Sequence, residues 1–219
     1  MDKKQTLDTP RYAAEALAKG DQYKWFDDLY RDAGGNADVI PWADPTLPEY
    51  LTEWLEKNNI TGNGKKALVI GCGLGRDAEE LAGRGFAVTA FDISQTAVEW
   101  TKRSHPDSRV DYHVADLFAM PAEWRAAFDL VVECYTVQAL PRNIRQKAIE
   151  AVKSVLREHG ELFVAARAFG KDQVEDPFPW AIKEDERSWF AEGLHEVFVH
   201  DFIEERTGRR RIVCLYRKD

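Results

Sequence analysis

A strand, a glycine-rich turn, a helix and a second strand follow one another in residues 67–94, ALVIGCGLGRDAEELAGRGFAVTAFDIS. Apolar β-branched residues run into Gly71, Gly73 and Gly75, a helical stretch follows, and a second apolar run ends at Asp92. Two strands joined through a helix predict a parallel pair, because parallel strands need a crossover connection. This unit restricts the chain to folds built on a parallel sheet.

The alternation of strand and helix continues through the rest of the chain. We expect strands at residues 66–71, 86–92, 109–116, 128–133 and 161–169. We expect helices at residues 76–85, 94–104 and 142–160, and a terminal hairpin at residues 196–218. Ser94 is predicted as an N-cap, Gly160 as the C-cap of the long helix, and Thr207-Gly208 as the hairpin turn. The pattern predicts an α/β, doubly wound, mostly parallel seven-stranded sheet with an antiparallel C-terminal hairpin.

Two segments outside this alternation are expected to cover the sheet's ligand-binding edge. Residues 1–60 are rich in aromatic side chains on helical faces and are interrupted by Pro41, Pro45 and Pro48, which predicts a helical lid. Residues 169–192 contain EDPFPWAIKEDE, which predicts an insert that shapes an acceptor site. We interpret residues 1–219 as one domain, with the core at 65–219.

The glycine turn indicates that the main chain approaches a ligand closely. Glycine tolerates positive φ and adds no Cβ, and the helix that follows presents free N–H groups. The spacing is G-x-G-x-G, whereas dinucleotide folds use G-x-G-x-x-G. Asp77, in the first helical turn, disfavours a pyrophosphate and suits a ligand with an ammonium group, although it could merely complement the helix dipole.

Two further carboxylates end the second and third predicted strands. Asp92 is expected to accept hydrogen bonds from a ribose diol, which adenine dinucleotides and S-adenosylmethionine both carry. Asp116 is expected to accept from an adenine amino group, with Leu117 as apolar cover and Ile93 on the other face of the ring. Each aspartate could instead be an ordinary turn residue.

These residues together resemble a known family. The motifs G-C-G-x-x-x-D, L-A-x-x-G-x-x-V and D-I-S, followed by ADLF, FDLVVE and ALP at 139–141, are similar to those of class I S-adenosylmethionine-dependent methyltransferases. Within that superfamily the chain resembles the thiopurine S-methyltransferase-like group, which includes thiol, halide and tellurite methyltransferases. The resemblance spans residues 22–217 and implies S-adenosyl-L-methionine as the cofactor.

The resemblance also implies a role for individual positions. Gly71, Gly73 and the backbone of Cys72 would approach the methionine part of the cofactor. Glu133 and Cys134 would lie beneath the sulfonium, and Trp25 and Trp42 would close over the cofactor. Drug-methylating relatives have Asp-Arg where this chain has Glu133-Cys134, which argues against an anionic thiopurine-type acceptor.

Few catalytic groups are needed for methyl transfer, because the cofactor carries the electrophile. A thiol acceptor is already partly ionised at neutral pH, whereas an oxygen or nitrogen acceptor needs a base. Glu133 and Tyr135 are the candidates for that base, and Arg167 is a candidate anion holder. Alternatively, Glu133 takes a cofactor amine, Tyr135 is packing and Arg167 pairs on the surface.

Composition excludes several other classes of function. A net charge of −8 argues against a nucleic-acid binder, and Arg209–Arg211 are interpreted as flanking a turn on a solvated strand. Three cysteines without CxxC spacing fit a reducing, cytoplasmic compartment, and the five scattered histidines predict no metal site. The sequence predicts no signal peptide, no membrane partner and a monomer acting on a small molecule.

The sequence favours a methyltransferase of small molecules with a thiol or another soft nucleophile as acceptor. Two alternatives remain open at this point. A nicotinamide-dependent oxidoreductase is disfavoured by the glycine spacing and by Asp77, and a non-catalytic nucleotide-binding module of the same fold is disfavoured by the near-complete set of cofactor residues.

Overall fold

A computed structural model describes residues 6–21, 23–43, 49–170 and 178–219 of the chain. Pro45, Pro48 and the central part of the predicted 169–192 insert therefore lie outside the described residues. The strands are β1 (Lys66–Ile70), β2 (Ala87–Asp92), β3 (Asp111–Val114), β4 (Phe128–Cys134), β5 (Leu156–Arg167), β6 (His195–Glu204) and β7 (Arg209–Arg217). The α-helices are α1 (Thr9–Ala18), α2 (Lys24–Asp32), α3 (Tyr50–Lys57), α4 (Arg76–Gly83), α5 (Gln95–Ser104), α6 (Arg142–Ser154) and α7 (Glu184–Ala191). Short 3-10 helices are η1 (Ala37–Val39), η2 (Leu117–Ala119), η3 (Ala122–Trp124) and η4 (Val137–Ala139).

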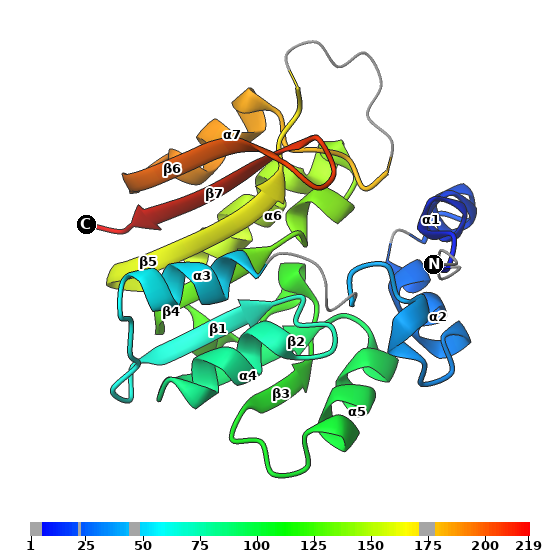
Figure 1. The fold of residues 1–219 in the computed structure, drawn as a ribbon, viewed down its shortest axis with the longest axis horizontal. Helices are drawn as coiled ribbons and strands as arrows, with labels where there is room; N and C mark the ends of the chain where they lie inside the picture. Colours follow the sequence, from blue (N-terminus) through cyan, green and yellow to red (C-terminus); the bar gives the residue numbers. More distant parts are fainter. Residues whose placement is uncertain (1–5, 22, 44–48, 171–177) are drawn as a thin grey trace.

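The seven strands form one sheet in the order β3-β2-β1-β4-β5-β7-β6, with β7 antiparallel to both β5 and β6 (Figure 1). This confirms the predicted doubly wound sheet with its C-terminal hairpin. The strand order reverses between β1 and β4, and ligands of such sheets bind at the carboxyl ends of the strands at that point. Both the glycine turn after β1 and residues 134–136 after β4 lie there.

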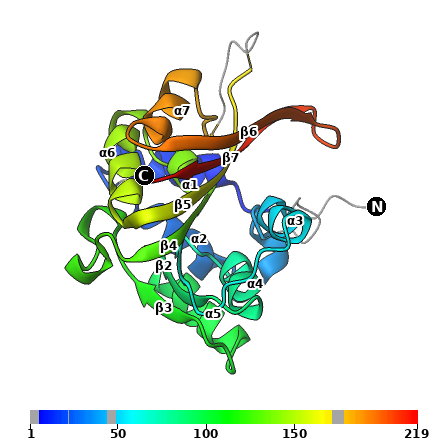
Figure 2. The same ribbon diagram turned by 90° about the vertical axis from the view of Figure 1, so that its left-hand side faces the viewer.

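Helices cover both faces of the sheet (Figure 2). On one face α6 and α7 pack on side chains such as Leu68, Val131 and Leu162. On the other face α3 and α4 pack on the alternate positions, including Ala67, Val69 and Phe163. Successive residues of one strand thus face opposite cores, which is why the central strands are apolar throughout.

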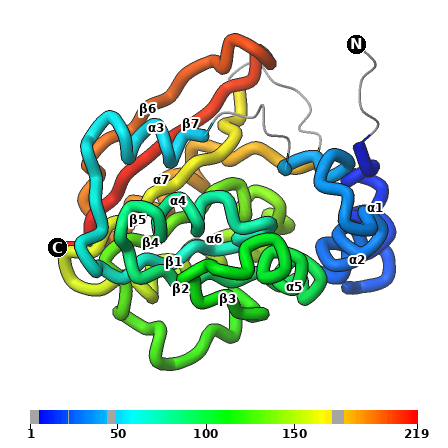
Figure 3. Tube along the Cα trace, turned by 60° about the horizontal axis from the view of Figure 1, so that its bottom comes forward, coloured from blue at the N-terminus to red at the C-terminus, as the bar shows by residue number. Residues whose placement is uncertain are grey.

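Helices α1 and α2 lie beyond the carboxyl ends of the parallel strands, where α2 packs on α5 (Figures 1 and 3). Asp27 fixes this arrangement, because its Oδ1 accepts from Ser94 Oγ at 2.8 Å and from the amide of Thr96 at 2.9 Å. Helix α3, which the sequence grouped with the lid, instead packs Leu51, Trp54 and Leu55 on the sheet.

Two predicted boundaries are wrong. Helix α6 ends at Ser154 rather than at Gly160, and β5 begins at Leu156. Leu156 pairs with Phe128, so the sheet includes residues 156–160, which helical periodicity predicted as part of the helix. Gly160 therefore lies within a strand. Val155 and Leu156, at this junction between helix and strand, are buried. Among the helices of the described ranges, none has the length and apolar character needed to cross a bilayer.

Candidate active site

The turn between β1 and α4 needs residues without side chains. Gly71, Gly73 and Gly75 have φ values of 63°, 52° and 86°, all in the left-handed region. A Cβ on Gly73 would lie 2.8 Å from the hydroxyl of Tyr30, and one on Gly75 would lie 2.5 Å from that of Tyr112. Both backbone conformation and space therefore require glycine here, as the sequence predicted.

Asp92 at the end of β2 is tied directly to this turn. Its Oδ2 accepts from the amide of Gly73 at 2.9 Å, and its Oδ1 accepts from the amide of Ser94 at 2.9 Å. Burial raises the pKa of Asp92, and these backbone donors act in the opposite direction. The side chain is only 6% exposed, yet it lines the main cavity. A carboxylate has lone pairs for about four hydrogen bonds, so acceptor capacity remains.

The end of β3 contributes a second acidic position. Asp116 caps η2 by accepting from the amide of Phe118 at 2.8 Å, which is the turn role that the sequence left open. It also lines the cavity, together with Ile93 and Leu117. Tyr23 lies with its ring centroid 6.1 Å from that of Phe118, so this end of the cavity has aromatic walls.

Asp77 faces the cavity from the first turn of α4. Burial raises its pKa, while a hydrogen bond from the Cys134 thiol and the charge of Arg76 oppose that shift. Burial also raises the pKa of the Cys134 and Cys72 thiols well above their ordinary value. Neither cysteine is therefore a ready nucleophile.

Aromatic side chains of the N-terminal segment form one side of the cavity. Trp42 Nε1 donates to the Tyr30 hydroxyl at 2.7 Å. Trp25 makes edge contacts with Trp42 and Phe178, with ring centroids 6.3 Å and 5.2 Å apart. Trp25 and Trp42 both line the cavity, so the structure brings the two predicted lid tryptophans to one place.

The cavity has a volume of about 510 Å³ and opens at the carboxyl ends of the strands. Twelve of the sequence-predicted site residues line it: Trp25, Trp42, Gly71, Cys72, Gly73, Asp77, Asp92, Ile93, Asp116, Leu117, Cys134 and Tyr135. Arg167, the candidate anion holder, lines it as well. Within the described ranges, no group of three or more histidine, cysteine, aspartate or glutamate side chains is arranged to hold a metal ion.

Glu133, which was expected beneath the sulfonium, is the exception, because the structure does not bring its side chain into the cavity wall. Its side chain is 1% exposed and is not part of the cavity wall. Alternation along β4 places Glu133 on the opposite face from Cys134, and its Oε1 accepts from the amide of Val137 at 2.8 Å. Burial raises the pKa of Glu133 to about 7. The carboxyl group therefore supports the loop after β4 from behind.

Tyr135, the other candidate base, does face the cavity. It has a φ of 64°, which is uncommon for an aromatic residue and turns the chain sharply after β4. Burial raises the pKa of its hydroxyl well above the ordinary value, and the guanidinium of Arg211 lies 5.7 Å from its ring centroid. A phenol in this state is protonated at neutral pH, which disfavours the use of Tyr135 as a base.

The sequence missed several cavity residues, above all Arg209 and Arg211 on β7. The expectation that this basic cluster lies on a solvated strand is wrong for Arg211, which is 7% exposed. Alternation along β7 was the available signal, since it separates Arg209 and Arg211 from Arg210. Arg210 pairs with Asp201 of β6 instead.

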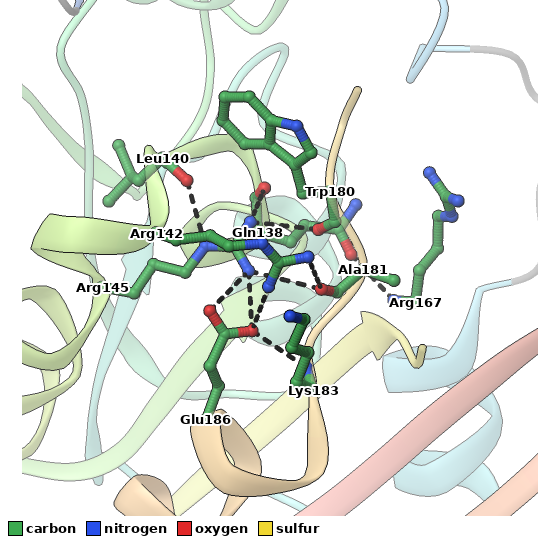
Figure 4. Close-up of polar contacts among 9 residues, drawn as sticks. All are labelled: Gln138, Leu140, Arg142, Arg145, Arg167, Trp180, Ala181, Lys183 and Glu186. Carbon is green, nitrogen blue, oxygen red and sulfur yellow. Dashed lines mark hydrogen bonds and ion pairs between the residues drawn. The ribbon is translucent and has the colours of Figure 1, made fainter. Parts of the chain in front are cut away.

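A buried ionic network links α6, α7 and the loop after β4 (Figure 4). Arg145 of α6 is fully buried and pairs with Glu186 of α7 at 2.9 Å. It donates to the carbonyl oxygens of Gln138 and Leu140 in the loop after β4, at 2.6 Å and 3.0 Å. It also donates to the carbonyl oxygen of Trp180 at 3.1 Å.

The network joins two separate cavity-lining segments. Gln138 Oε1 accepts from the amide of Arg167 at 2.8 Å, and Arg167 Nη1 donates to the carbonyl oxygen of Pro179 at 2.5 Å. Glu186 also pairs with Arg142 at 2.8 Å and caps the start of α7 by accepting from the amide of Lys183 at 2.9 Å. Buried charges of this kind are tolerated only when they are paired and hydrogen-bonded.

Comparison with known proteins agrees with this architecture. A family model described as "Methyltransferase domain" matches residues 67–160. A thiopurine S-methyltransferase of Aliivibrio fischeri is 24% identical over 71% of this chain and 76% of its own length. A probable thiol methyltransferase 2 of Arabidopsis thaliana is 26% identical over 75% of this chain and 73% of its own length. Among solved structures, the Burkholderia thailandensis 1,6-didemethyltoxoflavin-N1-methyltransferase has a TM-score of 0.70 at 18% identity and covers 97% of this chain and 91% of its own.

The fold, the glycine turn with its acidic strand ends, and these similarities define a class I S-adenosylmethionine-dependent methyltransferase that acts on small molecules. Within that class the chain is close to the thiopurine S-methyltransferase group. The two alternatives, an oxidoreductase and a non-catalytic module, are not favoured.

The residues present fit the cofactor of that class. The turn offers main chain without side chains, and the acids Asp77, Asp92 and Asp116 line the cavity together with apolar Ile93 and Leu117. Carboxylates can accept hydrogen bonds from an ammonium group and from a ribose diol, and apolar side chains can pack on an adenine ring.

Proposed function

We propose that the methyl acceptor is a thiol or another soft nucleophile on a small molecule. The observation that carries this proposal is the chemistry of the acceptor half of the cavity, which we define as the lining residues at the end of β4 and on β5 and β7. Among its described residues no histidine or carboxylate lines the wall, and the Tyr135 hydroxyl stays protonated. A thiol, with a pKa of about 8.5, needs no base to reach its reactive form.

We further propose the following roles in the cofactor half. The main chain of Gly71, Cys72 and Gly73 would approach the methionine moiety, Asp77 would take its ammonium group and Asp92 would take the ribose hydroxyls. The left-handed turn and its hydrogen bond to Asp92 support this assignment.

The adenine ring would lie between Ile93 and Leu117, with Asp116 at its amino group. Trp25 and Trp42 would close over the cofactor, and Cys134 would lie near the reacting carbon. All these side chains line the same cavity, which supports the assignment.

S-Adenosylmethionine supplies, when bound, a methyl group on an electrophilic sulfonium. The acceptor thiol loses its proton to water, its sulfur gains the methyl group, and S-adenosylhomocysteine is left. The protein's part is to hold the acceptor in line and to exclude bulk water. Aromatic walls suit this task, because they offer apolar surface to the acceptor and π-faces to a cation. Glu133 is outside the cavity, so we assign it no base role, and Tyr135 serves to position the acceptor.

We also propose that residues 1–219 form a single methyltransferase domain that acts as a monomer in the cytoplasm. A net charge of −8 supports a small-molecule substrate rather than a nucleic acid or an acidic membrane surface.

The test is a matched set of acceptors with radiolabelled S-adenosylmethionine. Thiophenol, phenol and aniline share one ring and differ in the nucleophilic atom. We expect methylation of thiophenol at neutral pH and little methylation of phenol or aniline. Faster methylation of phenol or aniline than of thiophenol would contradict the proposal.

A further inference from the structure

Apart from Glu49 and Arg76, which pair with each other at 3.3 Å, the charged residues of the cavity are segregated along the sheet. Asp77, Asp92 and Asp116 follow β1, β2 and β3, on one side of the reversal in strand order. Arg167 on β5 and Arg211 on β7 lie on the other side, and both line the cavity. The three aspartates suit the cationic ammonium group of the cofactor. The two arginines would then face the part of the cavity that remains for the acceptor.

The two arginines are neighbours by strand register. Arg167 and Arg211 are paired directly across β5 and β7, so their side chains leave the sheet on the same face. They are 8% and 7% exposed. Arg209, two residues earlier on β7, shares that face and is exposed at the rim. Like charges directly opposite one another are unfavourable in a sheet, so a role toward an anion would explain why this arrangement is kept.

Glu204 on β6 holds Arg211 in position. Its Oε2 accepts from Arg211 Nε at 3.0 Å and from Nη2 at 2.8 Å. Burial alone would raise the pKa of Glu204, but donors from Thr207 and Arg211 lower it, so the carboxylate stays ionised. Glu204 does not line the cavity. The guanidinium is therefore fixed from behind, with Tyr135 against one face.

A second polar group converges on the same place. Tyr50 of α3 lines the cavity, and its hydroxyl oxygen is buried beside the Arg211 guanidinium that Glu204 holds. A guanidinium can only donate to that oxygen, so the O–H of Tyr50 remains as a donor. An anion bound to Arg211 would therefore also be within reach of the phenol.

We propose that Tyr50, Arg167, Arg209 and Arg211 form a subsite for an anionic group of the acceptor, so that the substrate is a small thiol bearing a carboxylate. The absence of an arginine directly after β4, which argued against an anionic thiopurine-type acceptor, does not oppose this subsite, because its arginines come from β5 and β7. The inference rests on the proposed function, because it assigns a second recognition element to the same acceptor. Guanidinium groups bind carboxylates with paired N–H donors, and a phenol adds a further donor.

The experiment compares 4-mercaptobenzoate with its neutral methyl ester, which present the same thiol. Wild-type kcat/KM is expected to favour the acid by about tenfold or more, the size of a charge-assisted hydrogen bond. Arg209→Gln, at the exposed rim, and the double variant Glu204→Gln/Arg211→Met, which removes both buried partners together, are expected to lower that ratio toward one. Arg103→Gln, on exposed α5, is the matched control and should keep the wild-type ratio.

Binding of both compounds to the complex with S-adenosylhomocysteine is measured by calorimetry in parallel. If the acid binds more tightly than the ester and the variants lose that preference, but neither thiol is methylated, then the thiol proposal fails while the anionic subsite stands. If both thiols are methylated with equal kcat/KM, the subsite is overturned while the thiol proposal stands. A preference that persists in both variants would also overturn the subsite.

Discussion

The main-chain amide of Gly73 donates to Oδ2 of Asp92 across 2.9 Å, and so joins the turn after β1 to the end of β2. The two strands are adjacent and parallel, so their carboxyl ends meet at the same edge of the sheet. One carboxylate therefore both fixes the glycine turn and lines the cavity beside it. Loop geometry and ligand recognition depend on the same side chain.

Asp92→Ala should weaken binding of S-adenosylhomocysteine by about 100-fold or more, because two charge-assisted hydrogen bonds to the ribose would be lost. Isothermal titration calorimetry measures this directly. Asp107→Ala, which removes a carboxylate from an exposed loop, is the matched control. An Asp92→Ala variant that folds and keeps wild-type affinity would mean that the ribose lies elsewhere.

Gly73→Ala and Gly64→Ala separate backbone strain from crowding. Both residues have positive φ, but a Cβ on Gly64 meets open space, whereas one on Gly73 meets the Tyr30 hydroxyl at 2.8 Å. Chemical denaturation should show a loss of about 1 kcal/mol for Gly64→Ala and about 1–3 kcal/mol more for Gly73→Ala. Adding Tyr30→Phe should recover part of the extra loss. Equal losses at the two glycines would show that the turn is not crowded.

Loss of Arg145 should destabilise the fold by about 3–5 kcal/mol, because buried Glu186 keeps Arg142 but loses one cationic partner, and the carbonyl oxygens of Gln138 and Leu140 lose a buried donor. Arg145→Met tests this by denaturation, and Glu184→Gln in the exposed Arg187–Glu184 pair should cost less than about 1 kcal/mol. The milder Glu186→Gln should raise the acceptor KM more than it changes affinity for S-adenosylhomocysteine. An unchanged KM would leave the network without a role in positioning the acceptor wall.

The raised pKa of Glu133 makes the free energy of unfolding depend on pH. Its pKa rises from 4.5 to about 7 on folding, so the folded state keeps a proton that the unfolded state releases. Stability therefore falls as the pH rises from about 4.5 to about 7 and is level above that. Relative to wild type, Glu133→Gln should gain about 3 kcal/mol between pH 4.5 and pH 7.5, measured by urea denaturation. A difference that stays constant with pH would contradict burial of the ionised group.

Features set by neighbours in the sequence were predictable. The turn glycines, the Ser94 cap and the aspartates after β2 and β3 depend on local backbone chemistry, and the structure has them at those positions. Because parallel strands end at one edge, their meeting in one cavity follows from the fold class alone.

Features set by pairing across the chain were not predictable. Leu156–Gly160 has helical periodicity but joins β5, because pairing with Phe128 outweighs local preference. The burial of Arg211 depends on its pairing with Arg167 of β5 and Glu204 of β6, on the two strands that flank β7. Glu133 turns away from the cavity because of its register on β4, which composition does not reveal.

The most direct test of the whole account is thermal unfolding with S-adenosylhomocysteine, compared with NAD and NADP under identical conditions. At 100 times its dissociation constant, a ligand that binds only the folded state adds about 2.7 kcal/mol of stability. We predict a rise in the melting temperature with S-adenosylhomocysteine and none with either dinucleotide. A rise with NAD or NADP alone, or no rise with S-adenosylhomocysteine, would contradict the account.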